Sequence, residues 1–134
     1  MTTKNVYLTR RSRFSASHQL ENKALSTKEN KALFDKCTEV HGHNFELFVT
    51  IKGIPEKKTG MIMNISKMKD IIEKHVITEF DHNHLNNIAE FKELLPTTEN
   101  LCIVIWNRLK PYFGKKLYKV LIKETENIQT CYKG

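Results

Sequence analysis

The sequence has no long hydrophobic run anywhere in its 134 residues. A membrane-spanning helix needs roughly 18 consecutive apolar residues, and no segment approaches that length. Residues 1–14 also lack the apolar stretch that follows the charged residues of a secretory signal peptide. We therefore expect a cytoplasmic protein with no membrane partner.

Cysteine, glycine and proline are scarce. Cys37, Cys102 and Cys131 are an odd and widely spaced set, which argues against a disulfide framework and fits a reducing compartment. Five glycines and three prolines are too few for a disordered chain, and 40% of the residues are hydrophobic. No repeat and no long linker divides the sequence, so a single domain over residues 1–134 is expected.

Acidic residues are the minority among the charged ones, because 15 aspartates and glutamates face 22 lysines and arginines, for a formal charge of +7. This excess favours an anionic partner such as a nucleic acid or a phosphorylated small molecule, although a solvated lysine-rich surface would also explain it. The lysines are scattered, and no nucleic-acid-binding motif accompanies them. Nucleic acid is therefore not the expected partner.

Alternating apolar and polar residues predict four strands. They cover residues 5–18, residues 41–51, residues 118–124 and a short run around residues 128–132. The polar segment of residues 21–36 predicts a connecting loop with room for a short helical turn. The predicted inward faces consist of Val6, Leu8, Phe14, Ala16 and His18 on the first strand, His41, His43, Phe45, Leu47, Val49 and Ile51 on the second, and Tyr118, Val120, Ile122 and Glu124 on the third.

Two stretches have the period of an amphipathic helix. One begins behind the capping candidates Asn64 and Ser66 and continues to about residue 79. The other opens at Pro96 and ends near Pro111. The element order is ββααββ, which predicts an α+β fold with a four-stranded antiparallel sheet and two helices on one face.

The pair of histidines in His41-Gly42-His43 is the sharpest chemical signal. Side chains at positions i and i+2 of a strand point the same way, so both imidazoles can bind one metal ion. His18 ends the inward face of the first strand and is the natural third ligand. Three neutral imidazoles with one open position are typical of a catalytic zinc site, whereas packing or capping remains the alternative for each histidine taken alone.

Further side chains are candidates for acid–base or binding roles. Cys37 shortly precedes His41, where a metal ion would favour the thiolate form of the cysteine. Asp81 next to His82 is typical of a carboxylate that orients an imidazole, although many loops contain such a dipeptide. Glu124 ends an inward strand face, where its carboxylate needs either an internal cation or a substrate that offers N–H donors.

Six motifs follow one another along nearly the whole chain. They are Phe14-Ser15-Ala16-Ser17-His18, Cys37 with His41-Gly42-His43-Asn44, Thr59-Gly60-Met61-Ile62-Met63-Asn64, Asp81-His82-Asn83-His84-Leu85, Pro96-Thr97-Thr98-Glu99-Asn100 and Lys123-Glu124-Thr125. Together they resemble the 6-pyruvoyl-tetrahydropterin synthase family in order and spacing. Six motifs in one order are far more specific than any one of them.

The resemblance implies the tunnelling fold, in which copies of this sheet join into a barrel, commonly as a homotrimer or homohexamer with active sites at subunit interfaces. It implies zinc as the cofactor, with His18, His41 and His43 as the ligands. The implied partner is a small-molecule pterin, 7,8-dihydroneopterin triphosphate, whose charged tail suits a basic chain.

The resemblance also implies roles for the remaining candidates. Cys37 and the Asp81/His82 pair would exchange protons with the side chain of the substrate. The implied substrate-binding residues are Glu124, which would anchor the pterin ring, Thr97 and Thr98.

Two related reactions remain open. A pyruvoyl enzyme eliminates triphosphate with internal redox, whereas a 6-carboxy-tetrahydropterin synthase also releases acetaldehyde on the route to queuosine and related deazapurines. Met63-Asn64 and residues 25–30 resemble the pyruvoyl enzymes, while the short gap after Cys37 and Thr130-Cys131-Tyr132 resemble the carboxy enzymes. Some relatives use a glutamate near the position of Glu39 in place of the cysteine, which keeps the product open.

A third reading is a pterin- or zinc-binding module without catalysis, because a fold and its metal ligands do not establish turnover. The presence of Cys37, Asp81 and His82 together argues against that reading. An enzyme that releases the pyruvoyl product is the favoured prediction.

Overall fold

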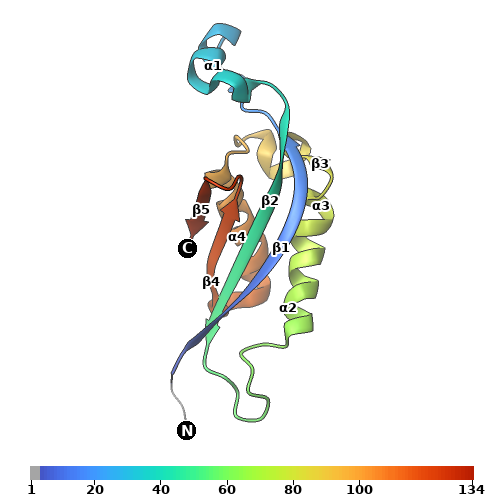
Figure 1. Cartoon of the computed structure of the whole chain (residues 1–134), viewed down its shortest axis with the longest axis vertical. Coiled ribbons are helices and arrows are strands. Elements are labelled where there is room, and N and C mark those ends of the chain that lie inside the picture. The colour runs from blue at the N-terminus through green and yellow to red at the C-terminus, as the bar shows by residue number, and fades with distance from the viewer. Residues whose placement is uncertain (1–3) are drawn as a thin grey trace.

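The structure, a computed structural model, describes residues 4–134 and contains a twisted five-stranded sheet with helices packed on one face (Figure 1). The strand order is β3-β1-β2-β4-β5. Antiparallel pairing joins β1 (Val6–His18) to β2 (His41–Gly53), β2 to β4 (Leu117–Lys123), and β4 to β5 (Gln129–Tyr132). These are the four strands that alternation predicts, and the α+β class is confirmed.

A fifth strand corrects the predicted sheet. β3 (Asn83–His84) lies along the other edge of β1 and runs parallel to it, so the prediction of a four-stranded antiparallel sheet is wrong. Two residues are too few to display alternation, which is why the sequence does not reveal this strand. The amide N–H of His82 donates to the carbonyl oxygen of Ser15 at 2.6 Å and holds the segment on the sheet.

Two helical rods cover the inner face of the sheet. One consists of α2 (Ile65–Ile72), a π-helical stretch (Glu73–Ile77) and α3 (Thr78–Phe80), and the other is α4 (Thr98–Phe113). The Asn64 side chain accepts hydrogen bonds from the N–H groups of Ser66 and Lys67, so Asn64 is the cap and Ser66 is not. Short 3₁₀ turns span Asp35–Thr38, Leu85–Asn87, Ala89–Lys92 and Gly114–Lys116.

Two helices differ from their predictions. α4 continues past Pro111 to Phe113 and ends at Gly114, whose φ of 57° lies in the left-handed region that stops a helix. The segment predicted as a loop forms α1 (Thr27–Phe34), which lies beyond the upper end of the sheet (Figure 1). Ser26 begins α1 with a reciprocal capping box to Glu29, a signal that is visible in the sequence.

The core lies between the inner face of the sheet and the two rods. Phe14 stacks on Phe45 with 5.0 Å between ring centroids, and Phe80 of α3 packs edge-on against Phe14 at 5.7 Å. Their burial, together with that of Leu47, Val49 and Ile51, confirms the predicted inward faces of β1 and β2. No helix within residues 4–134 is long and apolar enough to cross a membrane.

Two residues of the predicted inward faces do not enter the core. Val6 is exposed because the first residues of β1 extend past the helices (Figure 1). The pairing of β2 with β4 shifts register at Thr50/Ile51, so Leu117 enters the core in place of Tyr118. Tyr118 lies instead against Tyr7, with ring centroids 4.8 Å apart, on the outer face of the sheet.

Candidate active site and metal centre

Three histidines meet at the upper end of the sheet because of the β1–β2 register. His18 pairs directly with His41, and His43 pairs with Ala16, so the three imidazoles lie on one face. One ring nitrogen from each histidine lies within 4.8 Å of those of the other two. The predicted convergence of His18, His41 and His43 is therefore confirmed, and among residues 4–134 they are the cluster arranged to hold a metal ion.

Hydrogen bonds orient two of these imidazoles. Nδ1 of His18 lies 2.8 Å from the carbonyl oxygen of Pro96, and Nδ1 of His41 lies 2.8 Å from that of Glu39. A carbonyl can only accept, so each Nδ1 carries the proton and each Nε2 keeps a lone pair. Metal-binding histidines commonly donate their other ring N–H to a carbonyl in this way.

The electrostatic environment fits a bound cation. The Nε2 atoms of His18 and His43 are buried, and within the described part of the chain they have no hydrogen-bond partner. Burial lowers the pKa of both histidines, which favours the neutral imidazole that binds metals. Three neutral imidazoles suit zinc and leave a coordination position open.

Glu124 lies directly beside the histidine cluster. It follows β4, and its Oε1 is 3.5 Å from Nε2 of His18 and 3.5 Å from Nε2 of His43. Its side chain is only 18% exposed, so the carboxylate faces the site rather than bulk water. Sequence reasoning predicts an inward carboxylate here, and the contact with the two imidazoles is what the structure adds.

Cys37 occupies the 3₁₀ turn that leads into β2. Its carbonyl oxygen accepts the amide N–H of Leu20 at 2.7 Å, which closes the loop containing α1, and its side chain is partly buried. Its sulfur does not belong to the group of ligand atoms within 4.8 Å of one another.

Cys102 has a structural role. Its thiol is buried, and burial raises the pKa of the thiol to about 12. The thiol donates a hydrogen bond to the carbonyl oxygen of Thr130 at 3.1 Å.

Asp81 and His82 form the predicted pair beside β1. Nδ1 of His82 is 3.0 Å from Oδ2 of Asp81, and Oδ1 of Asp81 accepts the amide N–H of Ser15 at 2.8 Å. That backbone hydrogen bond is the main cause that lowers the pKa of Asp81. His82 has a φ of 57°, and its side chain is 83% exposed. An exposed imidazole held by a fixed carboxylate is suited to proton transfer.

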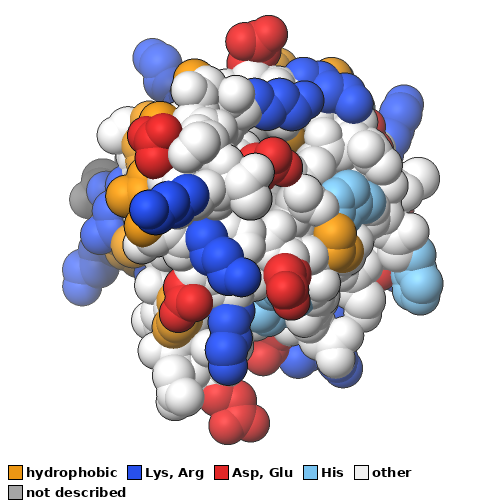
Figure 2. Space-filling model, turned by 90° about the horizontal axis from the view of Figure 1, so that it is seen from above, with side chains coloured by type: hydrophobic (Ala, Val, Ile, Leu, Met, Phe, Trp, Pro, Cys, Tyr) orange, Lys and Arg blue, Asp and Glu red, His pale blue; other side chains and the backbone are white. Residues whose placement is uncertain are grey.

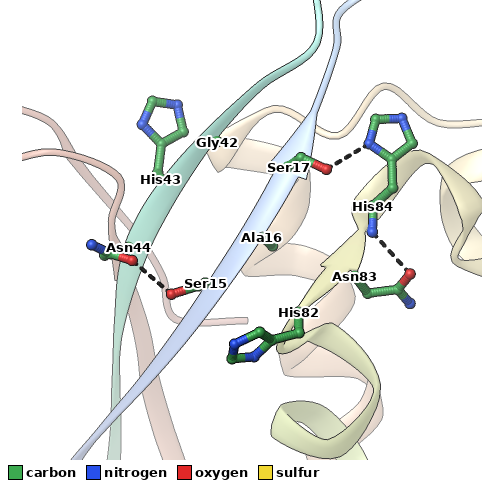
Figure 3. Close-up of a pocket in the computed structure, with 9 residues that line it drawn as sticks. All are labelled: Ser15, Ala16, Ser17, Gly42, His43, Asn44, His82, Asn83 and His84. Atoms are coloured by element: carbon green, nitrogen blue, oxygen red, sulfur yellow. Dashed lines mark hydrogen bonds between the residues drawn. The ribbon is translucent and has the colours of Figure 1, made fainter.

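An open hollow of about 470 Å³ is lined by both His43 and His82. Figure 3 shows His43 on β2 and His82 beside β3, with β1 passing between them. Two strand spacings separate β2 from β3, which is roughly 10 Å. Seen from the α1 end, histidine side chains reach the surface among interspersed acidic and basic ones (Figure 2).

Thr97 and Thr98 stand at the start of α4, directly after Pro96, whose carbonyl oxygen lies against the His18 ring. The Thr97 hydroxyl accepts the amide N–H of Asn100 at 3.2 Å as the helix cap, and the Thr98 side chain is buried. Sequence reasoning missed the carbonyl of Pro96 and the side chain of His84, which lines the hollow. The sequence signal that could have revealed His84 is the second histidine in Asp81-His82-Asn83-His84.

Comparisons with known proteins agree with this geometry. Residues 7–134 match the family model described as 6-pyruvoyl tetrahydropterin synthase. The 6-pyruvoyl tetrahydrobiopterin synthase of Dictyostelium discoideum is 45% identical over 133 residues, with 98% of each chain covered. The human protein of the same name is 40% identical over 131 residues, covering 95% of this chain and 90% of that one. The structure of Caenorhabditis elegans 6-pyruvoyl tetrahydropterin synthase superposes with a TM-score of 0.93 at 34% identity, covering 98% of this chain and 96% of that one.

Proposed function

Because the chain belongs to the 6-pyruvoyl tetrahydropterin synthase family, we propose that it converts 7,8-dihydroneopterin triphosphate into 6-pyruvoyl-tetrahydropterin and inorganic triphosphate. The observation that carries the proposal is the convergence of the His18, His41 and His43 imidazoles, with the Asp81/His82 pair on the other side of β1 from His43. The whole chain acts as one pterin synthase domain. Elimination of triphosphate breaks the terminal C–O bond of the side chain and, after tautomerisation, leaves a ketone next to a methyl group. The remaining side-chain hydroxyl is oxidised to the second ketone, and its two hydrogens go to the ring, so no external oxidant is needed.

The metal of this reaction is zinc, with His18, His41 and His43 as its ligands. The buried Nε2 atoms of His18 and His43, without hydrogen-bond partners in residues 4–134, support this assignment. When bound there, zinc would supply Lewis-acid polarisation of the side-chain oxygens of the substrate.

Proton transfer falls to Cys37 and to the Asp81/His82 pair. The exposed Nε2 of His82 can take up and return a proton while Asp81 holds the ring through Nδ1. The amide N–H of Ser15 fixes Asp81 in turn. Cys37 lies in the turn before β2, and a cation bound nearby would favour its thiolate.

Substrate binding involves Glu124, Thr97 and Thr98. The Glu124 carboxylate can accept two N–H groups of a pterin ring, and its position beside the histidine cluster keeps the ring close to the reacting side chain. Thr97 and Thr98 fix the start of α4, whose preceding carbonyl at Pro96 orients His18.

The active protein is a homotrimer or homohexamer in which the sheets join into a barrel. Two features support this assembly: β5 ends the sheet with an unpaired edge, and no helix of the described chain covers the outer face. Open edges of this kind pair readily with another chain.

The test is incubation of the zinc-loaded protein with 7,8-dihydroneopterin triphosphate. We expect inorganic triphosphate and 6-pyruvoyl-tetrahydropterin in equal amounts, with no acetaldehyde. Stoichiometric acetaldehyde would reassign the protein as a 6-carboxy-tetrahydropterin synthase. Absence of both triphosphate and acetaldehyde would leave a binding module in place of an enzyme.

A further inference from the structure

The segment that follows the Asp81/His82 pair runs beside the end of β1 in a constant register. β3 and β1 pair at His84 and Ser17, which are 67 positions apart in the sequence, and the two side chains are hydrogen-bonded as well (Figure 3). β3 then ends, because Leu85–Asn87 forms a 3₁₀ turn. A backbone that turns away from a strand cannot extend the ladder of backbone hydrogen bonds.

The side chain of Asn86 continues the ladder where the backbone leaves it. Its Oδ1 accepts the amide N–H of Gln19 at 3.0 Å, and its Nδ2 donates to the carbonyl oxygen of Gln19 at 2.9 Å. Gln19 and Asn86 are again 67 positions apart. A carboxamide has the donor and the acceptor of a peptide group, so the side chain takes the place of a backbone pair in the same register. Both backbone groups of Gln19 are thereby satisfied.

Asn86 acts at the point where β1 leaves β2. The pairing of these two strands ends at His18 and His41, which are both ligands in the proposed metal centre. Gln19 is the next residue, and its backbone binds the Asn86 side chain instead of β2. The direction of the His18 side chain depends on the backbone dihedral angles at that residue. Fixing the backbone of Gln19 therefore restricts the direction of the His18 side chain.

Asn86 is itself held in place by its neighbours. Leu85 and Ile88 flank it, and both side chains are buried in the core. The amide N–H of Ile88 donates to the carbonyl oxygen of Leu85 at 3.0 Å, which closes the turn around Asn86. Packed side chains and a closed turn leave the Asn86 backbone little freedom. Its carboxamide is therefore preorganised to bind Gln19.

The His18 imidazole is buried and held at one nitrogen. Its Nδ1 lies 2.8 Å from the carbonyl oxygen of Pro96, which leaves Nε2 for the metal. A ring held by one hydrogen bond can still pivot about that contact if its backbone moves. We propose that Asn86 is a positioning residue of the metal centre, whose hydrogen bonds to Gln19 hold the Nε2 of His18 in place for zinc. The metal itself rests on the proposed function.

Competition between the zinc-loaded protein and a chromophoric chelator tests this proposal without substrate. We expect Asn86→Ala to weaken zinc binding about tenfold, the lower end of the range for residues that support metal ligands. Asn86→Asp keeps an acceptor for the Gln19 N–H but loses the donor, so we expect an intermediate loss of about threefold. The matched control is Asn87→Ala, which removes the exposed carboxamide of the next residue and should change zinc affinity by less than about twofold.

Two further measurements separate positioning of His18 from a general loss of stability. The visible spectrum of the Co²⁺-substituted protein reports the geometry of the metal ligands, and it should change in Asn86→Ala but not in Asn87→Ala. Hydrogen exchange at the Gln19 amide should be faster in Asn86→Ala. An Asn86→Ala protein that melts at a lower temperature, but binds zinc and Co²⁺ as the unaltered chain does, would overturn the proposal.

The turnover test and the zinc measurement have separate outcomes, because zinc affinity is measured without substrate. A protein whose zinc affinity depends on Asn86, but which releases neither triphosphate nor acetaldehyde, would refute the proposed function and support the role of Asn86. A protein that turns the substrate over, and whose zinc affinity is the same in Asn86→Ala and in the unaltered chain, would refute the role of Asn86 alone.

Discussion

At the scale of single residues, the metal cluster depends on each of its three imidazoles. We expect His41→Ala to reduce zinc from about one ion per chain to a small fraction, because two ligands hold zinc poorly. Metal analysis of the purified protein measures this. His75→Ala is the control, since His75 stacks on Tyr112 at 3.8 Å and takes no part in the cluster. Full occupancy in His41→Ala would remove His41 from the ligand set.

Cys37 is predicted to act on protons and not on stability. Cys37→Ala should keep zinc and the melting temperature but lose turnover by ~10² to 10⁴, the range for a proton-transfer group. Cys131→Ala, which alters an exposed cysteine, should retain full activity. If Cys37→Ala turns over normally, the role passes to Glu39 or His82.

One variant separates two roles for Glu124, binding of the pterin ring and support of the metal ligands. Glu124→Gln should raise KM for the substrate with a small change in kcat, because a neutral amide accepts the pterin N–H groups less well. Zinc content should stay unchanged. Loss of zinc would show that the 3.5 Å contacts with His18 and His43 serve the metal, and unchanged KM would exclude an anchoring role.

The sequence predicts the three histidines but not the contact that orients His18. His18, His41 and His43 follow from strand alternation alone, since the parity that buries Phe14 and Phe45 also places the imidazoles together. The contact between His18 and the Pro96 carbonyl joins positions 78 residues apart and has no local pattern. Such contacts depend on how α4 packs against the sheet, which periodicity does not specify.

At the scale of elements, Arg108 ties three segments together. Its guanidinium donates to Glu90 at 2.6 and 2.7 Å and to the His75 carbonyl at 3.1 Å, and pairs with Glu79 at 2.6 Å. Arg108→Gln should lower the free energy of unfolding by about 1.5–3 kcal/mol, the range for hydrogen bonds to charged groups. The control, Arg11→Gln, breaks an exposed pair with Glu46 and should lower the free energy of unfolding much less. Equal losses in both variants would contradict a special role for the Arg108 cluster.

The stabilisation by Arg108 should depend on pH with a definite sign. The hydrogen bonds from Arg108 are the main cause that lowers the pKa of Glu90 below its ordinary 4.5. A carboxyl with a depressed pKa stabilises the fold above its unfolded value and loses this contribution as the pH falls through the folded value. The difference between the unaltered chain and Arg108→Gln should therefore be full at pH 7 and shrink below about pH 4.5. Denaturant unfolding at several pH values measures it, and a constant difference would contradict the pairing.

Short and irregular elements were the ones that escaped prediction. The helix expected to about residue 79 is present, but it contains a π-helical stretch. Within this stretch, the buried positions differ from those that a regular 3.6-residue period predicts. The consecutive residues Val76 and Ile77 are both buried there, and so is Phe80 after it. β3 and the register shift beside Tyr118 are likewise set by the neighbouring strand.

At the scale of the whole molecule, we predict a particle of three or six times the 15.7 kDa chain mass. In the proposed assembly, further copies of the chain would cover the open sheet face and pair with the free edge of β5. Light scattering during gel filtration measures the mass. A charged residue in the middle of β5, as in Thr130→Lys, should shift the distribution towards smaller species, and a monomeric unaltered protein would contradict the assembly.

The backbone of Ser15, and not its side chain, holds the Asp81/His82 pair against β1. Its N–H holds the Asp81 carboxylate, and its carbonyl accepts from His82, so the acid–base pair is attached to a position in the chain and not to a kind of residue. Every amino acid except proline supplies those two groups. The Ser15 hydroxyl donates to Asn44, but Asp81 and His82 do not depend on it, so the substitution at position 15 that disconnects them is proline, which removes the N–H. The position of this acid–base pair thus depends on backbone groups, which a comparison of side chains between relatives does not reveal.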